Sequence, residues 1–169
     1  YMAQISNLDK KYDPAIEPIR ALYDEYFGGG MNSIVFQEMR ETRGLAYSAW
    51  ASIMPPSYLK YPYVLRTQIA TQNDKMIDAV TTFNDIINNM PESEAAFKLA
   101  KDGLTNRLRT ERIIKGDIIW SYINAQDLGQ NVDPRIKLYN DIQNMSLKDI
   151  VDFQKQWVKG RTYVYCILG

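Results

Sequence analysis

Segments with strand periodicity and segments with helix periodicity are grouped along this chain and do not alternate regularly. Apolar side chains alternate in the first seven residues, in two neighbouring segments near the middle, and again close to the C-terminal end. Elsewhere they mostly recur every three to four positions, the period of an amphipathic helix. A parallel sheet needs a helix between successive strands, so the grouping favours antiparallel pairing. We expect an α+β fold with two layers, in which helices cover one face of a mostly antiparallel sheet.

The patterns predict about four strands and about six or seven helices. The expected strands are residues 1–7, 46–54, 62–72 and 161–168, and the expected helices are residues 13–27 (or 17–27), 32–42, 74–89, 91–113, 117–129, 133–145 and 146–160. The two central strands should form a hairpin with a long loop, because a proline-rich connection separates them. The chain has the length of one domain and no linker divides it, so we expect residues 1–169 to form a single domain.

The composition excludes several classes of function. Twenty basic and twenty acidic side chains balance, so the chain lacks the electrostatic footprint of a nucleic-acid-binding protein. No run of about 18 apolar residues occurs, so we expect no membrane span. The chain has no histidine and one cysteine, which removes the usual zinc ligands and the usual nucleophile–base pairs. We therefore expect no metal, no cofactor and no catalytic residue within this chain.

Several single residues with reactive or charged side chains receive structural interpretations. Cys166 lies in the last alternating run, and we expect a buried structural thiol there rather than a reactive one. The carboxylates Glu17, Asp24, Glu25 and Asp85 show no paired spacing. We therefore assign them to a solvated face.

Three consecutive glycines, Gly28, Gly29 and Gly30, follow the first predicted helix. A phosphate-binding P-loop would need Lys and then Ser or Thr after its last glycine, but Met31 and Asn32 follow here, and a dinucleotide-binding loop would follow a strand. The triplet can end the helix by supplying positive-φ positions at its C-cap. It can also form a loop whose bare backbone lets another chain approach closely. The triplet alone does not separate these two interpretations.

Arg40 and Tyr47 are the candidate binding residues. Arg40 lies on the second predicted helix and Tyr47 just beyond the next glycine turn, so a helix-turn-strand unit can bring both side chains to one end of the sheet. Arg offers a fork of N–H donors and Tyr an O–H donor on a rigid arm, and together they can hold a peptide carbonyl or a developing oxyanion. The alternative is that these side chains only form surface ion pairs among Glu38, Arg40, Glu41 and Arg43.

The stretch FGGGMNSIVFQEMRETRGLAYS, residues 27–48, resembles a segment of the pitrilysin, insulinase and mitochondrial processing peptidase family of zinc metallopeptidases (inverzincins), whose form is LGGGM-S-L-F-E-RE-RGLAY. MPESEAAFKLAKDGL and NMSLKDIVDFQKQWVKGRTYVYCILG are similar to the family's later helix and to its closing helix and strand, so the resemblance covers nearly all of the chain. In that family two similar halves close around an unfolded peptide. Each half contains two related α+β domains, and the zinc-binding H-x-x-E-H lies in the N-terminal half.

The resemblance implies a role that the residue patterns alone leave open. Without histidine the chain resembles a domain of the C-terminal, non-catalytic half, as an excised and slightly truncated piece of a longer peptidase. Zn²⁺ is then expected in the partner catalytic domain. Arg40 and Tyr47 match, in spacing and context, an Arg–Tyr pair that reaches the substrate near the scissile bond. Gly28, Gly29 and Gly30 match a glycine turn that faces the substrate cavity, so the resemblance implies that all five residues bind substrate.

Two functions follow from the resemblance. In the first, the chain binds and positions a peptide opposite the zinc site of the N-terminal catalytic half, which lies on the same or a neighbouring polypeptide. Proteolysis then occurs in the intact enzyme, this chain alone is not expected to be active, and the substrate often lies as an added strand against a sheet edge. In the second, it is a catalytically inactive family member that acts as a structural or peptide-binding subunit, as in respiratory-complex core proteins. The compartment stays open, with periplasm or cytoplasm favoured.

Overall fold

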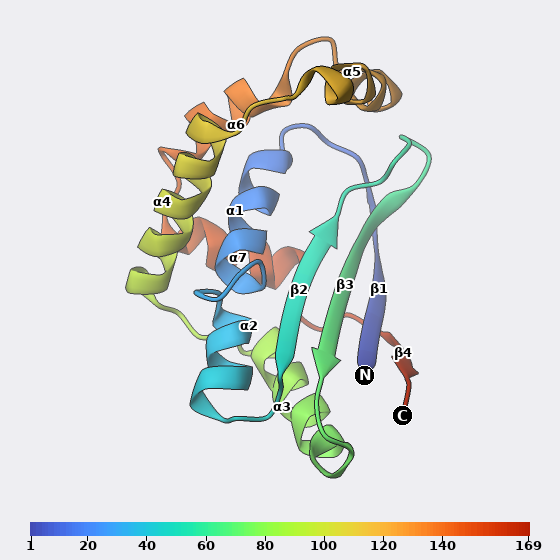
Figure 1. The fold of residues 1–169 in the computed structure, drawn as a ribbon, viewed down its shortest axis with the longest axis vertical. Helices are drawn as coiled ribbons and strands as arrows, with labels where there is room; N and C mark the ends of the chain where they lie inside the picture. Colours follow the sequence, from blue (N-terminus) through green and yellow to red (C-terminus); the bar gives the residue numbers. More distant parts are fainter.

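The computed structural model describes residues 1–169 and contains one antiparallel sheet with the strand order β2-β3-β1-β4 (Figure 1). The strands are β1 (Met2–Lys11), β2 (Ser48–Met54), β3 (Pro62–Ala70) and β4 (Val164–Ile167). β3 pairs with both β2 and β1, and β4 joins the sheet by pairing with β1 from the far end of the sequence. The sheet therefore has two edge strands, β2 and β4.

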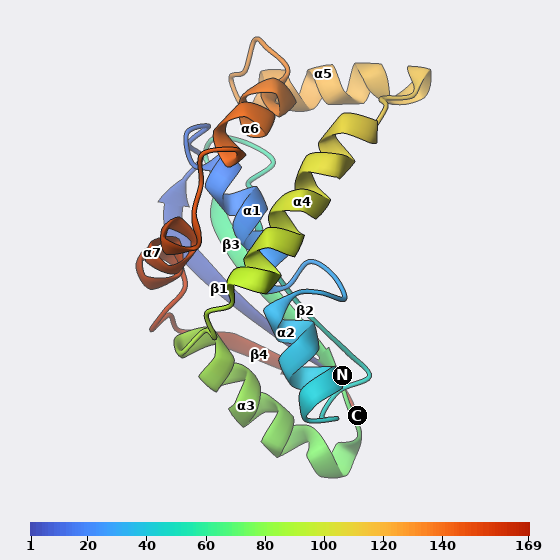
Figure 2. The same ribbon diagram turned by 90° about the vertical axis from the view of Figure 1, so that its left-hand side faces the viewer.

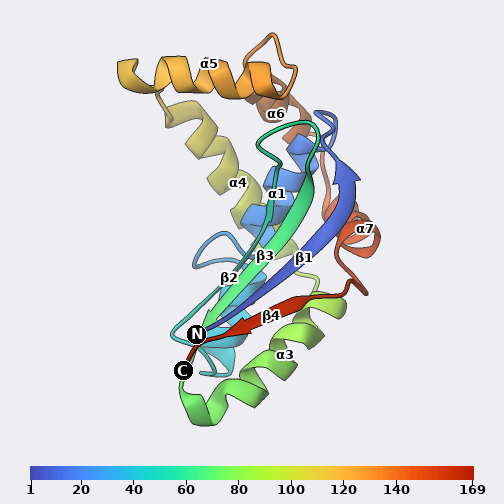
Figure 3. The ribbon, with the colours of Figure 1, turned by 90° about the vertical axis from the view of Figure 1, so that its right-hand side faces the viewer.

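The helices lie mainly on one side of this sheet, and its other face stays open (Figures 2 and 3). They are α1 (Glu17–Phe27), α2 (Ile34–Phe36), the π-helix η1 (Gln37–Thr42), the 3₁₀ turn η2 (Asn73–Lys75), α3 (Met76–Asn88), α4 (Glu94–Thr110), the 3₁₀ turn η3 (Lys115–Asp117), α5 (Ile118–Asp127), α6 (Pro134–Ile142) and α7 (Leu147–Trp157). In Figure 1, α5 extends across one end of the molecule and α3 lies at the opposite end. None of these helices combines the length and the apolar character that crossing a membrane requires.

The core lies between the helices and the inner face of the sheet, where 30 apolar side chains are buried in one cluster. Alternation along each strand points one set of side chains inward, and Met2 and Leu8 of β1 are buried in this way. Aromatic rings join α1 to α7: the ring centroid of Tyr23 lies 5.2 Å from that of Phe153, which lies 5.1 Å from that of Trp157. These contacts hold α1 in place, and α1 leads directly into the glycine triplet.

The predicted fold class is confirmed, and most predicted helices and strands form near their expected residues. Ser146 and Asp149 make a capping box at the start of α7. β1 is longer than expected, because residues 9–11 continue the strand after an irregularity beyond Asn7. The prediction that Cys166 is buried is wrong: β4 is an edge strand that pairs only with β1, and all four of its residues are exposed.

Candidate functional site

A capped turn leads into the helix that carries Arg40. Ser33 precedes α2, where its hydroxyl accepts a hydrogen bond from the backbone N–H of Phe36 at 3.4 Å and donates one to the carbonyl of Gly30 at 2.6 Å. The chain then widens from α2 into the π-helix η1, on which Arg40 lies. π-helical turns are rare and occur frequently at functional sites. The helix periodicity of the sequence does not reveal this widening.

Backbone hydrogen bonds fix the two ends of the turn between Arg40 and Tyr47. The amide of Gly44 donates to the carbonyl of Arg40 at 3.1 Å. Gly44 has a φ of 58°, a left-handed conformation that glycine adopts without steric cost, and it ends the helix as predicted. Beyond the turn, the amide of Tyr47 donates to the carbonyl of Ala70, at the end of β3, at 2.8 Å. Both candidate residues therefore sit at the same end of the sheet.

The side chain of Arg40 is exposed and keeps most of its N–H donors free. Its guanidinium carbon lies 5.0 Å from the ring centroid of Phe36, a cation–π contact, and its Nε lies 3.7 Å from a carboxylate oxygen of Glu41. Arg43 and Glu38 form a second ion pair in the same turn, at 3.3 Å. The surface ion pairs of the alternative interpretation therefore exist, but exposed pairs contribute only about 0–1 kcal/mol. They do not engage the whole guanidinium of Arg40.

Tyr47 presents a hydroxyl with a free proton. Its side chain is 64% exposed, and the hydroxyl oxygen accepts a hydrogen bond from Nε2 of Gln72 at 2.8 Å. Because the hydroxyl is the acceptor in this bond, its own O–H remains available to donate. Gln72 lies two residues beyond β3, so the bond orients the Tyr47 ring relative to the end of the sheet. The joint role of Arg40 and Tyr47 stays a prediction.

The glycine triplet does not have the predicted backbone conformation. None of its residues has a positive φ, and Gly28, the C-cap of α1, has a φ of −141°. Gly28 is buried where α1 meets β2: a Cβ atom added to it would lie 2.2 Å from the carbonyl oxygen of Ala51. At Gly29 the added atom would lie 2.8 Å from the carbonyl oxygen of Asp24, and at Gly30 nothing lies within 4 Å. Close packing therefore explains the first two glycines, and the exposed members of the triplet are Gly29 and Gly30.

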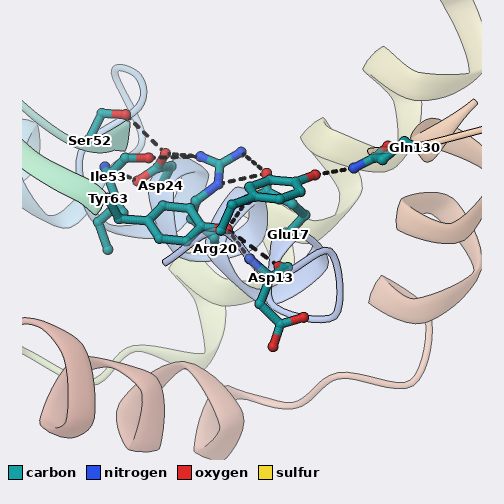
Figure 4. Close-up of polar contacts among 9 residues, drawn as sticks. Asp13, Glu17, Arg20, Asp24, Ser52, Ile53, Tyr63 and Gln130 are labelled. Atoms are coloured by element: carbon teal, nitrogen blue, oxygen red, sulfur yellow. Dashed lines mark hydrogen bonds and ion pairs between the residues drawn. The ribbon is translucent and has the colours of Figure 1, made fainter. Parts of the chain in front are cut away.

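The sequence analysis missed a polar cluster beside the edge strand β2 (Figure 4). Arg20 lies between two carboxylates, 2.9 Å from Glu17 and 2.8 Å from Asp24. Asp24 also accepts hydrogen bonds from the amide of Ile53 at 2.8 Å and the hydroxyl of Ser52 at 2.9 Å. The assignment of Glu17 and Asp24 to a solvated face is therefore wrong. Their spacing around Arg20, three residues before and four after, is the signal in the sequence, since such residues share one helix face.

The environment of this cluster shifts the pKa values of several of its members, Asp24 and Tyr63 among them. Burial raises the pKa of the Asp24 carboxyl to about 6, although the guanidinium, amide and hydroxyl that contact it all favour the charged form. Tyr63 donates its hydroxyl proton to Glu17 at 2.6 Å, and burial together with that carboxylate raises the pKa of Tyr63. The cluster also pairs both backbone groups of Ile53. The amide of Ile53 donates to Asp24, and its carbonyl accepts a hydrogen bond from Arg20 at 3.0 Å.

A protein-family model described as the peptidase M16 inactive domain matches residues 17–104. This range runs from α1 into α4 and includes the glycine triplet, η1 and the β2–β3 hairpin. The chain belongs to the peptidase M16 inactive-domain family. The predicted membership of the insulinase-like zinc metallopeptidases is thereby confirmed, and within that group the chain is an M16 inactive domain.

Solved structures of M16 inactive domains have the same fold. One from Pseudomonas fluorescens is similar with a TM-score of 0.79 and 15% identity, over 97% of this chain and 39% of that one. The inactive peptidase domain of a proposed zinc protease from Bordetella parapertussis is similar with a TM-score of 0.75 and 12% identity, over 99% of this chain and 90% of that one. A chain of complex III2 from Candida albicans is similar with a TM-score of 0.65 and 15% identity, over 97% of this chain and 41% of that one. This chain thus spans about two fifths of the first and third of these chains. None of the curated protein sequences compared with it is a significant match.

Proposed function

We propose that this M16 inactive domain binds a peptide substrate and positions it opposite the zinc site of a partner domain. The observation that carries the proposal is the pair Arg40 and Tyr47, which are both exposed at one end of the sheet and keep donors free. The partner is the N-terminal catalytic half, on the same or a neighbouring polypeptide. In this proposal the partner holds the zinc, which agrees with the absence of any group of three or more potential metal ligands in this chain.

Arg40 and Tyr47 would act on the oxygen of the scissile peptide bond. That oxygen gains negative charge when the carbonyl carbon is attacked, and preorganised donors stabilise the charge. The guanidinium of Arg40 is permanently cationic, and Gln72 holds the ring of Tyr47 in one direction. Since both donors bind the charged oxygen more strongly than the neutral carbonyl, they would raise kcat. Losing one such donor typically lowers kcat by about 10²–10³-fold.

The glycine segment and the sheet edge make different contributions to this proposal. Gly29 and Gly30 offer exposed main chain close to α2, which can lie against the backbone of a peptide. A peptide added as a strand to β2 would need the backbone groups that Ile53 directs to the sheet edge. Asp24 and Arg20 already occupy them. We therefore assign peptide contact here to side-chain donors and to the glycine main chain, not to the edge of β2.

Hydrolysis of a quenched-fluorescence peptide in the presence of zinc tests the proposal. This chain alone, the partner half alone and both together are compared, and cleavage is expected only when both halves are present. In the complete protein, Arg40→Ala should lower kcat/KM by about 100-fold or more. Arg43→Ala is the matched control, because Arg43 is an exposed arginine of the same turn.

Tyr47→Phe adds a second, independent variant that removes only the hydroxyl. It should lower kcat, whereas Tyr58→Phe, at another exposed tyrosine, should not. Wild-type turnover by both Arg40→Ala and Tyr47→Phe would refute the assigned roles. Cleavage by this chain alone would refute the need for a partner.

Peptide binding or subunit assembly without cleavage is the second candidate function. The likeness to a chain of complex III2 from Candida albicans favours it. The same assay separates the two candidates. A folded protein that binds the peptide but cuts it in no combination of halves would support the second.

A further inference from the structure

A cavity of about 520 Å³ is lined by α5 and the elements beside it. In Figure 1, α5 lies at the end of the molecule away from α2. Tyr12, the start of α1 and α5 all line the cavity. The segment that joins α5 to α6 closes one side, where Gln130 donates a hydrogen bond to the hydroxyl of Tyr12. The volume falls within the range of about 300–1,000 Å³ that is usual for ligand pockets.

The walls of the cavity are mainly apolar. Ile113 lines it from the segment after α4, and Leu128 and Val132 line it from the segment that joins α5 to α6. Tyr122 and Ala125 also face it from α5, and Leu128 follows at the same helical spacing. α5 contains no buried residue at all. An occupant of the cavity would therefore bury apolar surface on a helix that otherwise packs against little.

The charged side chains of the cavity carry an excess of carboxylates. Both cations are already paired, Arg20 with Glu17 and Arg135 with Asp133. The remaining carboxylate, Glu111 at the end of α4, takes part in no ion pair. With three carboxylates against two guanidinium groups, the lining has a net negative charge.

We infer that this cavity binds a lysine or arginine side chain of a peptide, with the cation near Glu111 and the aliphatic stem against the apolar wall. Such side chains combine an apolar stem with a charged end, which matches a mainly apolar cavity that has one unpaired carboxylate. The inference rests on the proposed function in taking a peptide as the source of the side chain. It adds a second contact point at the opposite end of β2 from Tyr47, because Pro55, just beyond β2, lines the cavity.

Calorimetric titration of the complete protein with two short peptides tests the inference. The probes are N-acetyl-Leu-Arg-Leu-amide and the same peptide with citrulline, which has a similar shape but no charge. A chelator removes zinc, so that no peptide is cut. The arginine peptide should bind about threefold to fivefold more tightly than the citrulline peptide. Glu111→Gln should abolish this preference, and Glu94→Gln, at the other end of α4, should preserve it.

Arg135→Gln provides a variant whose expected effect is a gain. It removes a competing cation and frees Asp133, so the arginine peptide should bind about threefold more tightly. A misfolded protein could not produce that result. Equal affinity for the two peptides, or a preference that survives Glu111→Gln, would overturn the inference. Since this experiment measures binding without zinc and the Arg40 experiment measures hydrolysis, the two proposals can fail separately.

Discussion

Replacing Gly28 with alanine should destabilise the protein, because α1 touches the backbone of β2 at this residue. The added Cβ would lie 2.2 Å from the carbonyl oxygen of Ala51 and 2.4 Å from its nitrogen. The first distance is about 1.2 Å shorter than the 3.4 Å at which ordinary contact begins. Both atoms belong to the backbone, so no rotation of a side chain relieves the overlap. α1 must move away from β2 or lose its last turn.

The expected cost has two parts. Forcing an extra methyl group into a packed region costs about 1–3 kcal/mol. Moving α1 also stretches the hydrogen bonds that Asp24 accepts from Ile53 and Ser52, each worth about 0.5–1.5 kcal/mol. We expect a loss of about 3 kcal/mol in the free energy of unfolding. For a domain of this size that corresponds to a fall of about 6–12 °C in Tm.

Urea and thermal unfolding, followed by circular dichroism, measure this loss. Gly30→Ala is the matched control, because nothing lies within 4 Å of the added atom and its φ is not positive. Its unfolding free energy should stay within about 0.5 kcal/mol of the wild type. If Gly28→Ala and Gly30→Ala unfold at the same urea concentration with the same m-value, the packing argument for Gly28 is wrong.

Two further predictions concern the polar groups of the interior. Burial raises the pKa of Asp24 to about 6 in the folded protein, above its value of about 3.9 in an unfolded chain, so the folded state binds this proton more tightly. As the pH falls from about 7 to about 4, the wild type should gain on the order of 3 kcal/mol in stability relative to Asp24→Asn. Urea titrations at several pH values measure this, and a difference in unfolding free energy between the two proteins that does not change with pH would contradict it. Gln154 accepts a hydrogen bond from the hydroxyl of Tyr23 and donates one to the carbonyl of Ile87. Gln154→Leu leaves both partners buried and unpaired, so it should lower the free energy of unfolding by about 2–4 kcal/mol. Adding Tyr23→Phe removes one unpaired hydroxyl, so the double mutant should recover part of that loss in a double-mutant cycle.

Local patterns predicted the elements that depend on neighbouring residues. The glycine turn after the helix expected at residues 32–42 depends on bonds within a few residues, and the structure contains it at Gly44. The hairpin of β2 and β3 followed from two alternating segments with a proline-rich connection. The same reasoning placed Arg40 and Tyr47 on either side of one turn at one end of the sheet.

The incorrect predictions concern residues whose surroundings come from distant parts of the chain. Gly28 was expected to supply a positive φ, but its role is set by the backbone of Ala51, which approaches from β2. Asp24 was assigned to solvent, but it lies against the edge of the sheet, where burial dominates its pKa. Cys166 alternates as a buried strand residue would, yet it lies in an exposed edge strand.

The sequence by itself determined the order of strands and helices, the absence of a histidine-based catalytic site, and the resemblance to the family that the comparisons confirm. Only the tertiary structure decided that Gly28 packs against the backbone of β2 while nothing lies within 4 Å of a Cβ added at Gly30. It also decided that Arg20 binds the carbonyl of Ile53 at the edge of β2, and that α5 lines a cavity. The physical reason is that periodicity reports which face of a helix or strand is buried. It does not report which atoms of a distant segment lie against that face, and those atoms set the contacts and the pKa values.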